Sequence, residues 1–396
     1  MTLQARESWL PTREDHPQSA AELAALLREA QEAGETVIVA GKGLRLEHGN
    51  ATKADRLLRT THLNRLLDYQ PDDMTVTAEA GMTLAALQEI LAARGQRLAL
   101  DPAHAEETTL GGLVAATPDG PWRAAFGTVR DQLLGLTVAS PDGTIFKSGS
   151  RVVKSVAGYD LPKLFAGSYG TLGVITQVTF RVRPLPTASG AIRTHFDNLS
   201  QLDAAWRALR RAPLEPSFFE TGVDAKGAFL AMGFEGEPEA VLWQQEEVAR
   251  RLETDGERET DHLRLDLAQR SHAAEAPLLV KVSLPPAEAI AFLQDAHDGV
   301  GRGGTWVGHA ANGILYGSYA AAEGWDVPAG RAMIEALRAQ AAERRGHLVV
   351  QRAPLAWKAG WDVWGPKRAD FPLMKAVKHA FDPRGILAPG RFVGGL

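Results

Sequence analysis

Apolar positions in the first half of the chain follow a helical spacing in some stretches and a strand spacing in others. The first helical stripe begins at Ser19, which has capping-box spacing to a glutamate, and ends at Gly34. A second helix is predicted between Thr83 and Gly95. Short runs that are rich in β-branched residues predict strands at 37–40, 74–80 and 174–180. The two strand-like runs within 133–147 flank a Ser-Pro-Asp-Gly turn, which favours an antiparallel hairpin over a purely parallel sheet.

The second half is rich in alanine, and helical and strand patterns again alternate. Helices are expected near 199–211, 237–253, 286–298, 329–345 and 368–381. Strands are expected near 228–234, 278–283, 313–318 and 347–352. Prolines and a glycine at 184–190 mark a boundary, so we expect a first domain over 1–190 followed by an α+β domain of antiparallel strands.

Composition removes several kinds of chemistry. The 396 residues include no cysteine, which excludes disulfides, cysteine nucleophiles and iron–sulfur clusters held by this chain. The formal net charge is −5, so we expect no nucleic-acid partner. The N-terminal residues have no apolar signal segment, and no run of about 18 apolar residues predicts a membrane span. We therefore expect a cytoplasmic protein that is peripheral at a membrane only through its partners.

Three separate segments contain clustered glycines: Gly41-Lys42-Gly43, the pair Gly111-Gly112, and the run 167–173. The first is not a dinucleotide fingerprint, because Leu46 stands where the third glycine of G-x-G-x-x-G would fall. P-loop, serine-elbow and zincin motifs are also absent. Each segment alone is typical of a turn. Together, their backbone N–H groups are suited to line one long ligand that contains a pyrophosphate.

The order of these segments and their surroundings resemble one family. The run from Arg151 to Ile175 matches K-x-V-A-G-Y-D-L-x-x-L-x-x-G-S-x-G-x-L-G-V-[IL] at almost every position, and F-D-P-x-G-x-x-x-P-G-R runs from Phe381 to Arg391. Both are similar to FAD-linked oxidases of the vanillyl-alcohol oxidase or p-cresol methylhydroxylase type, and within these to the smaller FAD-binding subunit (E subunit) of bacterial glycolate oxidase. The resemblance implies an α+β fold with a two-part FAD-binding domain over 1–190, a cap domain with an antiparallel sheet over 191–380, and a C-terminal segment, 381–396, that returns to the FAD domain.

By this resemblance the protein binds FAD non-covalently, since no histidine or cysteine stands where covalent members attach the flavin; we expect His48 to be a surface residue. The first loop departs from the family pattern at Leu44, where a threonine is usual, and Tyr169 and Ala388 replace a usual glutamate and asparagine. The implied FAD-binding residues are Gly41, Lys42, Gly43, Leu44, Arg45, Pro102, Thr108, Thr109, Gly111, Gly112, Gly173, Val174 and Ile175. Tyr159 and Asp160 are expected either to contact FAD or to form hydrogen bonds in a buried turn.

The resemblance also implies the oxidation of a small 2-hydroxy acid, glycolate to glyoxylate, by hydride transfer to the flavin. Such a reaction needs a base for the hydroxyl and a cation for the carboxylate. The second half contains His309, His347, Arg352 and Lys358, but the pattern does not single one out. No catalytic residue and no metal ligand is assigned.

Reduced flavin must pass its electrons on, and a chain without cysteine cannot hold an iron–sulfur relay. The resemblance therefore implies the larger FAD-binding subunit and the iron–sulfur subunit of glycolate oxidase as partners. Two alternatives stay open: an independent FAD-dependent dehydrogenase for another hydroxy acid, and a non-catalytic scaffold subunit. Trp357, Trp361 and Trp364 have the spacing of one helical face, which suits either core packing or a partner interface.

Overall fold

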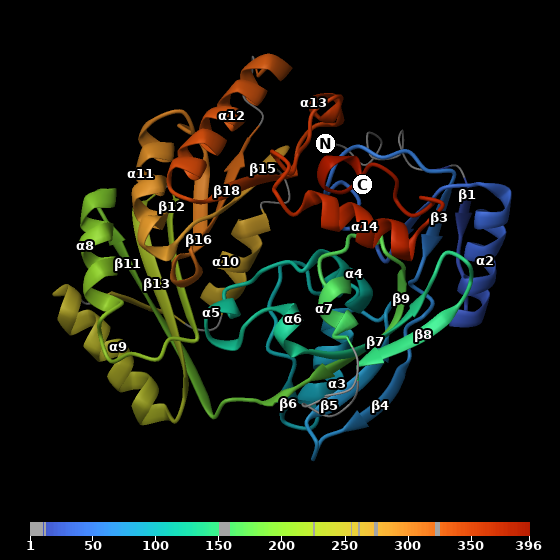
Figure 1. Cartoon of the computed structure of the whole chain (residues 1–396). Helices are drawn as coiled ribbons and strands as arrows, with labels where there is room; N and C mark the ends of the chain where they lie inside the picture. The colour runs from blue at the N-terminus through green and yellow to red at the C-terminus, as the bar shows by residue number, and fades with distance from the viewer. Residues whose placement is uncertain are drawn as a thin grey trace.

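The computed structural model consists of two α+β parts that lie side by side, each built on its own β-sheets (Figure 1). The structure describes residues 11, 13–149, 159–224, 226–254, 256–259, 262–272, 276–320 and 325–396. The mixed helical and antiparallel architecture confirms the expected fold class. No helix of these described residues is long and apolar enough to cross a membrane.

The first part contains two main sheets. A parallel sheet has the strand order β1 (Arg13–Asp15), β3 (Arg56–Arg59), β2 (Val37–Ala40). An antiparallel sheet has the order β4 (Leu66–Gln70), β5 (Thr75–Glu79), β9 (Val174–Arg181), β7 (Leu133–Ala139), β8 (Ile145–Gly149). The predicted hairpin of β7 and β8 is thus confirmed. Helix α2 (Ala20–Ala33) is capped by the Ser19 hydroxyl and ends at Gly34 in the left-handed conformation, as its sequence predicts.

Short helices pack on the antiparallel sheet. They are α3 (Leu84–Ala92), α4 (Leu110–Ala116), α6 (Val129–Gln132) and α7 (Leu161–Phe165). Helix α5 (Arg123–Phe126) instead contacts β12 (Phe218–Asp224) of the second part, and β6 (Gln96–Arg97) pairs with β10 (Arg183–Pro184) in a small two-stranded sheet. The second glycine segment, expected as a loop, is the first turn of α4. The Thr109 hydroxyl caps this helix by accepting the N–H of Gly112 (3.3 Å), which makes two adjacent glycines compatible with a helix start.

The second part is built on one antiparallel sheet. Its strand order is β14 (Glu257–Glu259), β11 (Ala188–Phe196), β13 (Gly227–Gly236), β12 (Phe218–Asp224), β16 (Thr305–His309), β17 (Ile314–Tyr319), β15 (Leu278–Ser283), β18 (His347–Arg352). The sequence analysis missed β11, β12, β14 and β16, because glycine and polar residues interrupt the apolar alternation of these strands.

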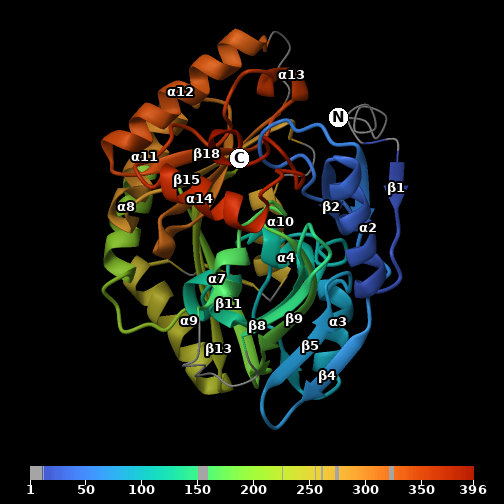
Figure 2. The same cartoon turned by 45° about the vertical axis from the view of Figure 1, so that its right-hand side comes forward.

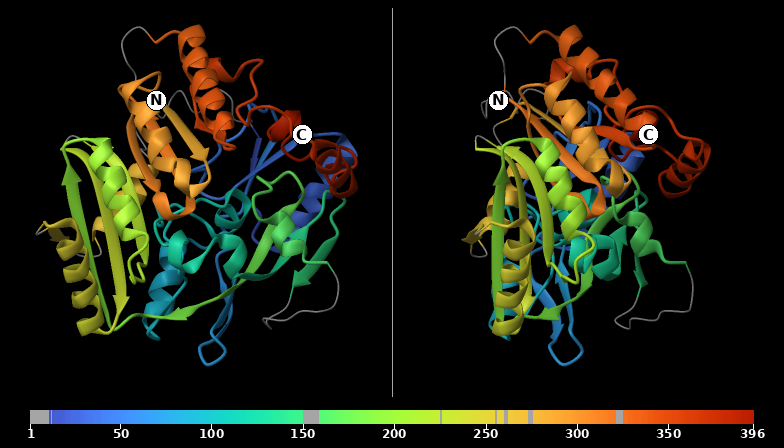
Figure 3. Two further views of the ribbon diagram at one scale, coloured as in Figure 1. Left: turned by 60° about the vertical axis from the view of Figure 1, so that its left-hand side comes forward. Right: turned by 90° about the vertical axis from the view of Figure 1, so that its left-hand side faces the viewer.

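Helices cover one face of this sheet, as Figure 3 shows. They are α8 (Leu199–Leu209), α9 (Pro238–Leu252), α11 (Ala289–Asp298, preceded by the 3-10 turn Pro286–Glu288) and α12 (Val327–Glu343). Helix α10 (His262–His272), which was not predicted, packs on the opposite face. Because side chains alternate along a strand, β15 turns Val280 and Val282 toward the covering helices and Leu279, Lys281 and Ser283 toward the first part.

The C-terminal residues return to the first part. Helix α14 (Phe371–Phe381) lies beside α7 in Figures 1 and 2, where Phe381 packs edge-on against Phe165 (5.4 Å between ring centres). Leu387 then forms a parallel bridge with Val37 of β2. Lys378 of α14 donates to the carbonyls of Thr171 (2.8 Å) and Leu387 (2.9 Å), and so links the third glycine segment to the chain end.

The expected tryptophan face does not exist. Helix α13 covers only Leu355–Lys358, because Ala359 is already extended (ψ 116°) and Gly360 then adopts a left-handed conformation (φ +65°). Trp357 is buried in the core, whereas Trp361 and Trp364 lie in the irregular segment that follows, partly exposed. The three indoles therefore do not share one helical surface.

Candidate functional site

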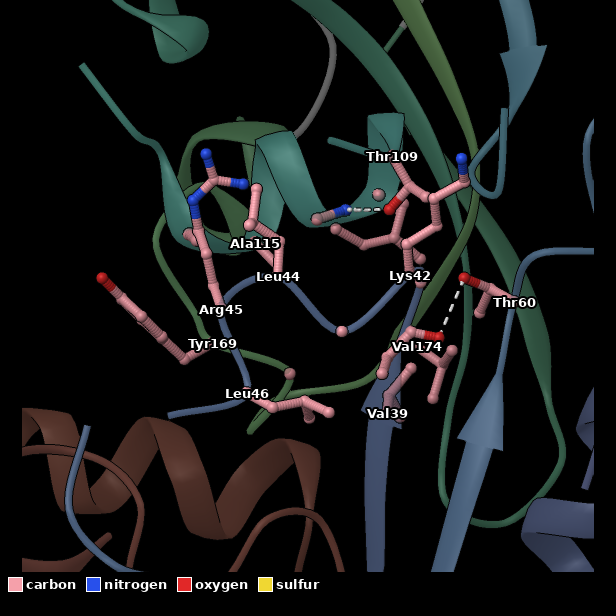
Figure 4. Close-up of a pocket in the computed structure, with 18 of the residues that line it drawn as sticks. Val39, Lys42, Leu44, Arg45, Leu46, Thr60, Thr109, Ala115, Tyr169 and Val174 are labelled. Carbon is pink, nitrogen blue, oxygen red and sulfur yellow. Dashed lines mark hydrogen bonds between the residues drawn. The ribbon is translucent and has the colours of Figure 1, made fainter. Parts of the chain in front are cut away.

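The structure has two adjoining chambers, which share Arg45, Ala116 and Tyr169 as wall residues. The first chamber, of about 740 Å³, lies within the first part and is drawn in Figure 4. The second chamber, of about 830 Å³, lies between the two parts.

The first chamber brings the three glycine segments together. Its walls come from the loop after β2, the first turn of α4 and the start of β9, which are far apart in the sequence. The predicted site residues that line it are Gly41, Lys42, Gly43, Leu44, Arg45, Thr109, Gly111, Gly112, Gly173, Val174 and Ile175. Pro102 and Thr108 do not line it; the Thr108 hydroxyl lies behind the wall and accepts Nη1–H of Arg45 (3.2 Å).

The first loop presents unpaired donors. Within the described chain, the backbone N–H groups of Lys42, Gly43, Leu44 and Arg45 donate to no other protein group. Gly43 has a φ of +88°, a conformation that favours glycine and turns successive N–H groups toward one side. Such a run of free N–H groups forms an anion nest, the kind of site that binds phosphate oxygens.

The α4 segment contributes close packing rather than free donors. The N–H of Gly111 already donates to Ala80 (2.7 Å), and that of Gly112 is taken by the Thr109 cap. A Cβ atom on Gly41 would lie only 2.1 Å from the Thr109 hydroxyl oxygen, so the first loop can approach α4 only with glycine at that position.

Two buried cations hold the carbonyls of the following loop. Arg391 donates Nη2–H to the carbonyl of Arg45 (2.8 Å) and Nε–H to that of His48 (3.1 Å), while Lys358 donates to that of Gly49 (3.0 Å). Burial lowers the pKa of Arg391 to about 10 and the pKa of Lys358 to about 8, so both remain mainly protonated at pH 7. Their positive charge adds to the nest and makes this region suited to a phosphorylated ligand.

The second chamber is walled by the sheet of the second part. Alternate residues of β15 and β18 face it, among them Lys281 and His347, together with Tyr316 of β17. Behind this wall, the fully buried Asp119 accepts hydrogen bonds from Arg123, Lys281 and the Tyr316 hydroxyl (3.1 Å). These cations keep the pKa of Asp119 below its usual value despite the cost of burial, so the carboxylate stays ionised.

The candidate residues of the second half separate in the structure. His347 lines the second chamber, whereas His309 is completely buried and its Nδ1 pairs with the Glu220 carboxylate (2.8 Å). Lys358 supports the loop after β2, and Arg352 donates to the carbonyl of Ala276 (3.1 Å). Only His347 of this group is placed to meet a ligand in either chamber.

One further expectation is wrong, and one of the two alternatives for Tyr159 and Asp160 is excluded. His48 is buried at 4% exposure and lines the second chamber rather than the surface, because Arg391 draws its carbonyl inward. The turn at Tyr159 is not buried: the Tyr159 side chain is 92% exposed, and Asp160 pairs with Lys163 on the surface. The preceding motif residues 151–158 lie outside the described residues.

Sequence reasoning missed Tyr169, Lys281 and Arg391 as site residues. Tyr169 adopts a positive φ (+53°) between Ser168 and Gly170, and its ring packs edge-on against Trp364 at the junction of the chambers (5.0 Å between ring centres). A lysine in the apolar strand run 278–283 was a detectable signal, since charged residues are rare in buried strands. Arg391 is the last residue of the C-terminal F-D-P-x-G-x-x-x-P-G-R motif, but the neighbouring sequence does not indicate that it contacts the loop at 45–48.

Comparison with known proteins agrees with this geometry. The family model described as FAD binding domain matches residues 11–149, and that described as FAD linked oxidases, C-terminal domain, matches residues 363–392. Both include segments that build the first chamber, and they support FAD as the cofactor. The expected resemblance to FAD-linked oxidases is thereby confirmed.

Relatives and solved structures extend the likeness over the chain. Glycolate oxidase subunit GlcE of Escherichia coli (strain K12) is 41% identical, over 32% of this chain and 37% of that subunit. Glycolate oxidase subunit GlcD of Bacillus subtilis (strain 168) is 23% identical over 95% of this chain and 87% of that one, and D-2-hydroxyglutarate dehydrogenase of Xanthomonas citri pv. viticola is 27% identical over 95% and 88%. The solved structure of alkyldihydroxyacetonephosphate synthase shares the fold, with a TM-score of 0.69 at 17% identity over 95% of this chain and 76% of that one.

Proposed function

We propose that this chain, an FAD-dependent oxidoreductase, binds the pyrophosphate of FAD in the first chamber and oxidises a small 2-hydroxy acid in the second. The observation that carries the proposal is the junction of the two chambers at Arg45 and Tyr169. On one side of this junction lies the nest of free N–H groups, which suits a pyrophosphate. On the other lies a chamber with a lysine, an arginine and two histidines in its wall, which suits an organic acid.

Bound FAD supplies the acceptor for the hydride that leaves the α-carbon of the acid. The chain must remove the hydroxyl proton, and we assign this step to His347. His347 is exposed at the start of β18, but partial desolvation of its ring and the nearby Lys281 and Arg368 lower its pKa, so the imidazole is neutral at pH 7 and able to accept a proton.

Glycolate is the first substrate candidate, because two of the similar proteins are named glycolate oxidase subunits. The name of a third, D-2-hydroxyglutarate dehydrogenase, makes larger 2-hydroxy acids the second candidate. Anaerobic absorption spectroscopy of the FAD-loaded chain decides between them. Bleaching of the flavin band by glycolate supports the proposal; no bleaching by glycolate, lactate or 2-hydroxyglutarate contradicts it.

A second proposal concerns the assembly in which the chain works. The 396 residues hold no thiolate for an iron–sulfur relay, and two of the similar proteins are named as subunits. We infer that the chain is the E-type subunit of a cytoplasmic glycolate oxidase complex, with a larger FAD-binding subunit and an iron–sulfur subunit as partners. Rapid turnover of glycolate by the lone chain with a soluble dye as acceptor would instead support an independent dehydrogenase. Flavin that no acid reduces, even with the partners present, would support the scaffold role.

A further inference from the structure

The wall of the second chamber is positively charged. Its ionisable side chains are Arg45, His48, Lys281 and His347, with two tyrosines, and no carboxylate is among the described residues that line it. Asp119, which accepts a hydrogen bond from Lys281, is buried and does not line the chamber. A chamber with this balance attracts an anion and repels a cation.

Lys281 is a fixed cation on this wall. Its ammonium donates to Asp119, which also accepts from Arg123, so two positive charges share one negative charge and one positive charge remains in excess. A lysine ammonium has three N–H donors, and Asp119 takes only part of this capacity. The ammonium also lies 5.9 Å from the centre of the Tyr316 ring, which faces the same chamber. Lys281 is therefore held in place with donors left for a ligand.

Arg45 is a second cation, with one edge unused. Its Nη1 donates to Thr108, but Nε and Nη2 are buried and have no hydrogen-bond partner within the described part of the chain. These two nitrogens form one edge of the planar guanidinium, the edge that binds both oxygens of a carboxylate. A buried guanidinium without a counter-charge is costly, and a bound anion removes that cost.

Arg45 lies at the boundary of the two chambers and lines both. In Figure 4 its guanidinium lies beside Ala115, a wall residue of the first chamber, across the loop from the side chain of Lys42. Tyr169 and Tyr316, which both interact electrostatically with Arg45, line the second chamber, whereas His104, which also interacts with Arg45, lines neither chamber. The nest of N–H groups and Lys42 thus remain for a phosphate on the other side.

We propose that Lys281 and Arg45 form a carboxylate-binding subsite in the second chamber. The inference rests on the proposed function, because the carboxylate is assigned to the 2-hydroxy acid. It adds the residues that recognise the acid and predicts that uncharged alcohols bind poorly. An ion-paired carboxylate also fixes the α-carbon in one orientation, as a substrate-positioning clamp does.

The test uses oxalate, a dicarboxylate without an α-hydrogen, titrated into the FAD-loaded full chain by calorimetry. Lys281→Met and Arg45→Gln are each expected to weaken oxalate binding about 10- to 100-fold, as for the loss of a hydrogen bond to a charged group. Lys281→Arg restores most of the affinity because it keeps the charge. Lys226→Met is the matched control, since Lys226 is an exposed lysine that pairs with Glu257 away from both chambers. FAD affinity, measured by flavin fluorescence, is expected to stay within about twofold in the Lys281 variants.

The outcomes separate this inference from the proposed function. Oxalate affinity that is unchanged in both Lys281→Met and Arg45→Gln overturns the subsite, even if glycolate reduces the flavin. Weaker FAD binding with unchanged oxalate binding in Arg45→Gln assigns the guanidinium to the cofactor and also overturns the inference. Oxalate binding that depends on Lys281 and Arg45 supports the subsite, even if no 2-hydroxy acid reduces the flavin. Should Lys281→Met fail to fold, Arg45→Gln and Lys281→Arg against the wild type give the same decision.

Discussion

Replacing Arg391 with methionine is expected to weaken both the fold of the first part and its hold on FAD. The guanidinium makes two short hydrogen bonds, to the carbonyls of Arg45 (2.8 Å) and His48 (3.1 Å), and two longer ones. A hydrogen bond that involves a charged group contributes about 1.5–3 kcal/mol, so the two short bonds contribute roughly 3–6 kcal/mol. Methionine no longer buries a charge, and this offsets part of the loss. We expect the free energy of unfolding to fall by about 2–4 kcal/mol, a large fraction of the roughly 5–15 kcal/mol of a typical domain.

Loss of these bonds also frees the carbonyls that orient the first loop, so its N–H groups no longer converge. We expect the dissociation constant of FAD to rise at least about tenfold, which removes roughly 1.4 kcal/mol of the stabilisation that FAD provides at saturating concentrations. Thermal unfolding with and without added FAD measures both effects, and flavin fluorescence gives the dissociation constant directly. The variant is expected to melt lower and to gain less from FAD than the wild type.

Arg384→Met is the matched control. Arg384 lies in the same C-terminal segment, is exposed, and donates to the carbonyl of Gln31 (2.9 Å) without touching the first loop. A substitution of this kind typically changes stability by less than about 0.5 kcal/mol. If Arg391→Met matched Arg384→Met in melting temperature and in FAD affinity, the argument that Arg391 builds the cofactor loop would be wrong.

Three other changes test separate parts of the molecule. Gly41→Ala is expected to abolish FAD binding, because the new Cβ would lie 2.1 Å from the Thr109 hydroxyl oxygen. Gly112→Ala is the control, since its new Cβ would meet only the same oxygen, at 3.0 Å. Equal FAD affinity in the two variants would contradict the expectation. For His347→Asn we expect flavin reduction to slow about 100-fold. Since the pKa of His347 is lowered, the wild-type rate should be level from pH 7 to 8 and fall only below about pH 6.5, and a profile that falls on raising the pH would exclude this base. Glu253 ends α9 in a left-handed conformation (φ +51°) that glycine adopts without strain. Glu253→Gly should therefore raise the free energy of unfolding by about 1 kcal/mol, as measured by urea titration. A urea midpoint below that of the wild type would refute the expectation.

The parts of the fold that were predictable have strong local signals. Helix α2 carries its own cap and stop, and the β7–β8 hairpin carries its own turn, so neither depends on distant residues. The strands β11, β12 and β16 were missed because their stability comes from neighbours in the sheet rather than from their own composition. The glycine pair at the start of α4 read as a loop because a cap and tertiary packing outweigh its low helix propensity.

The sequence by itself determined which segments line the first chamber: the glycines at 41 and 43 and the motif around 173 are local features, and their kind pointed to a phosphate ligand. Only the tertiary structure decided what holds and charges that site. Arg391 reaches Arg45 across 346 residues, and Lys281 faces the second chamber because the pairing of β15 in its sheet sets which side it points to. Such contacts are fixed by chain return and strand register, which are properties of the whole packed molecule rather than of any short stretch.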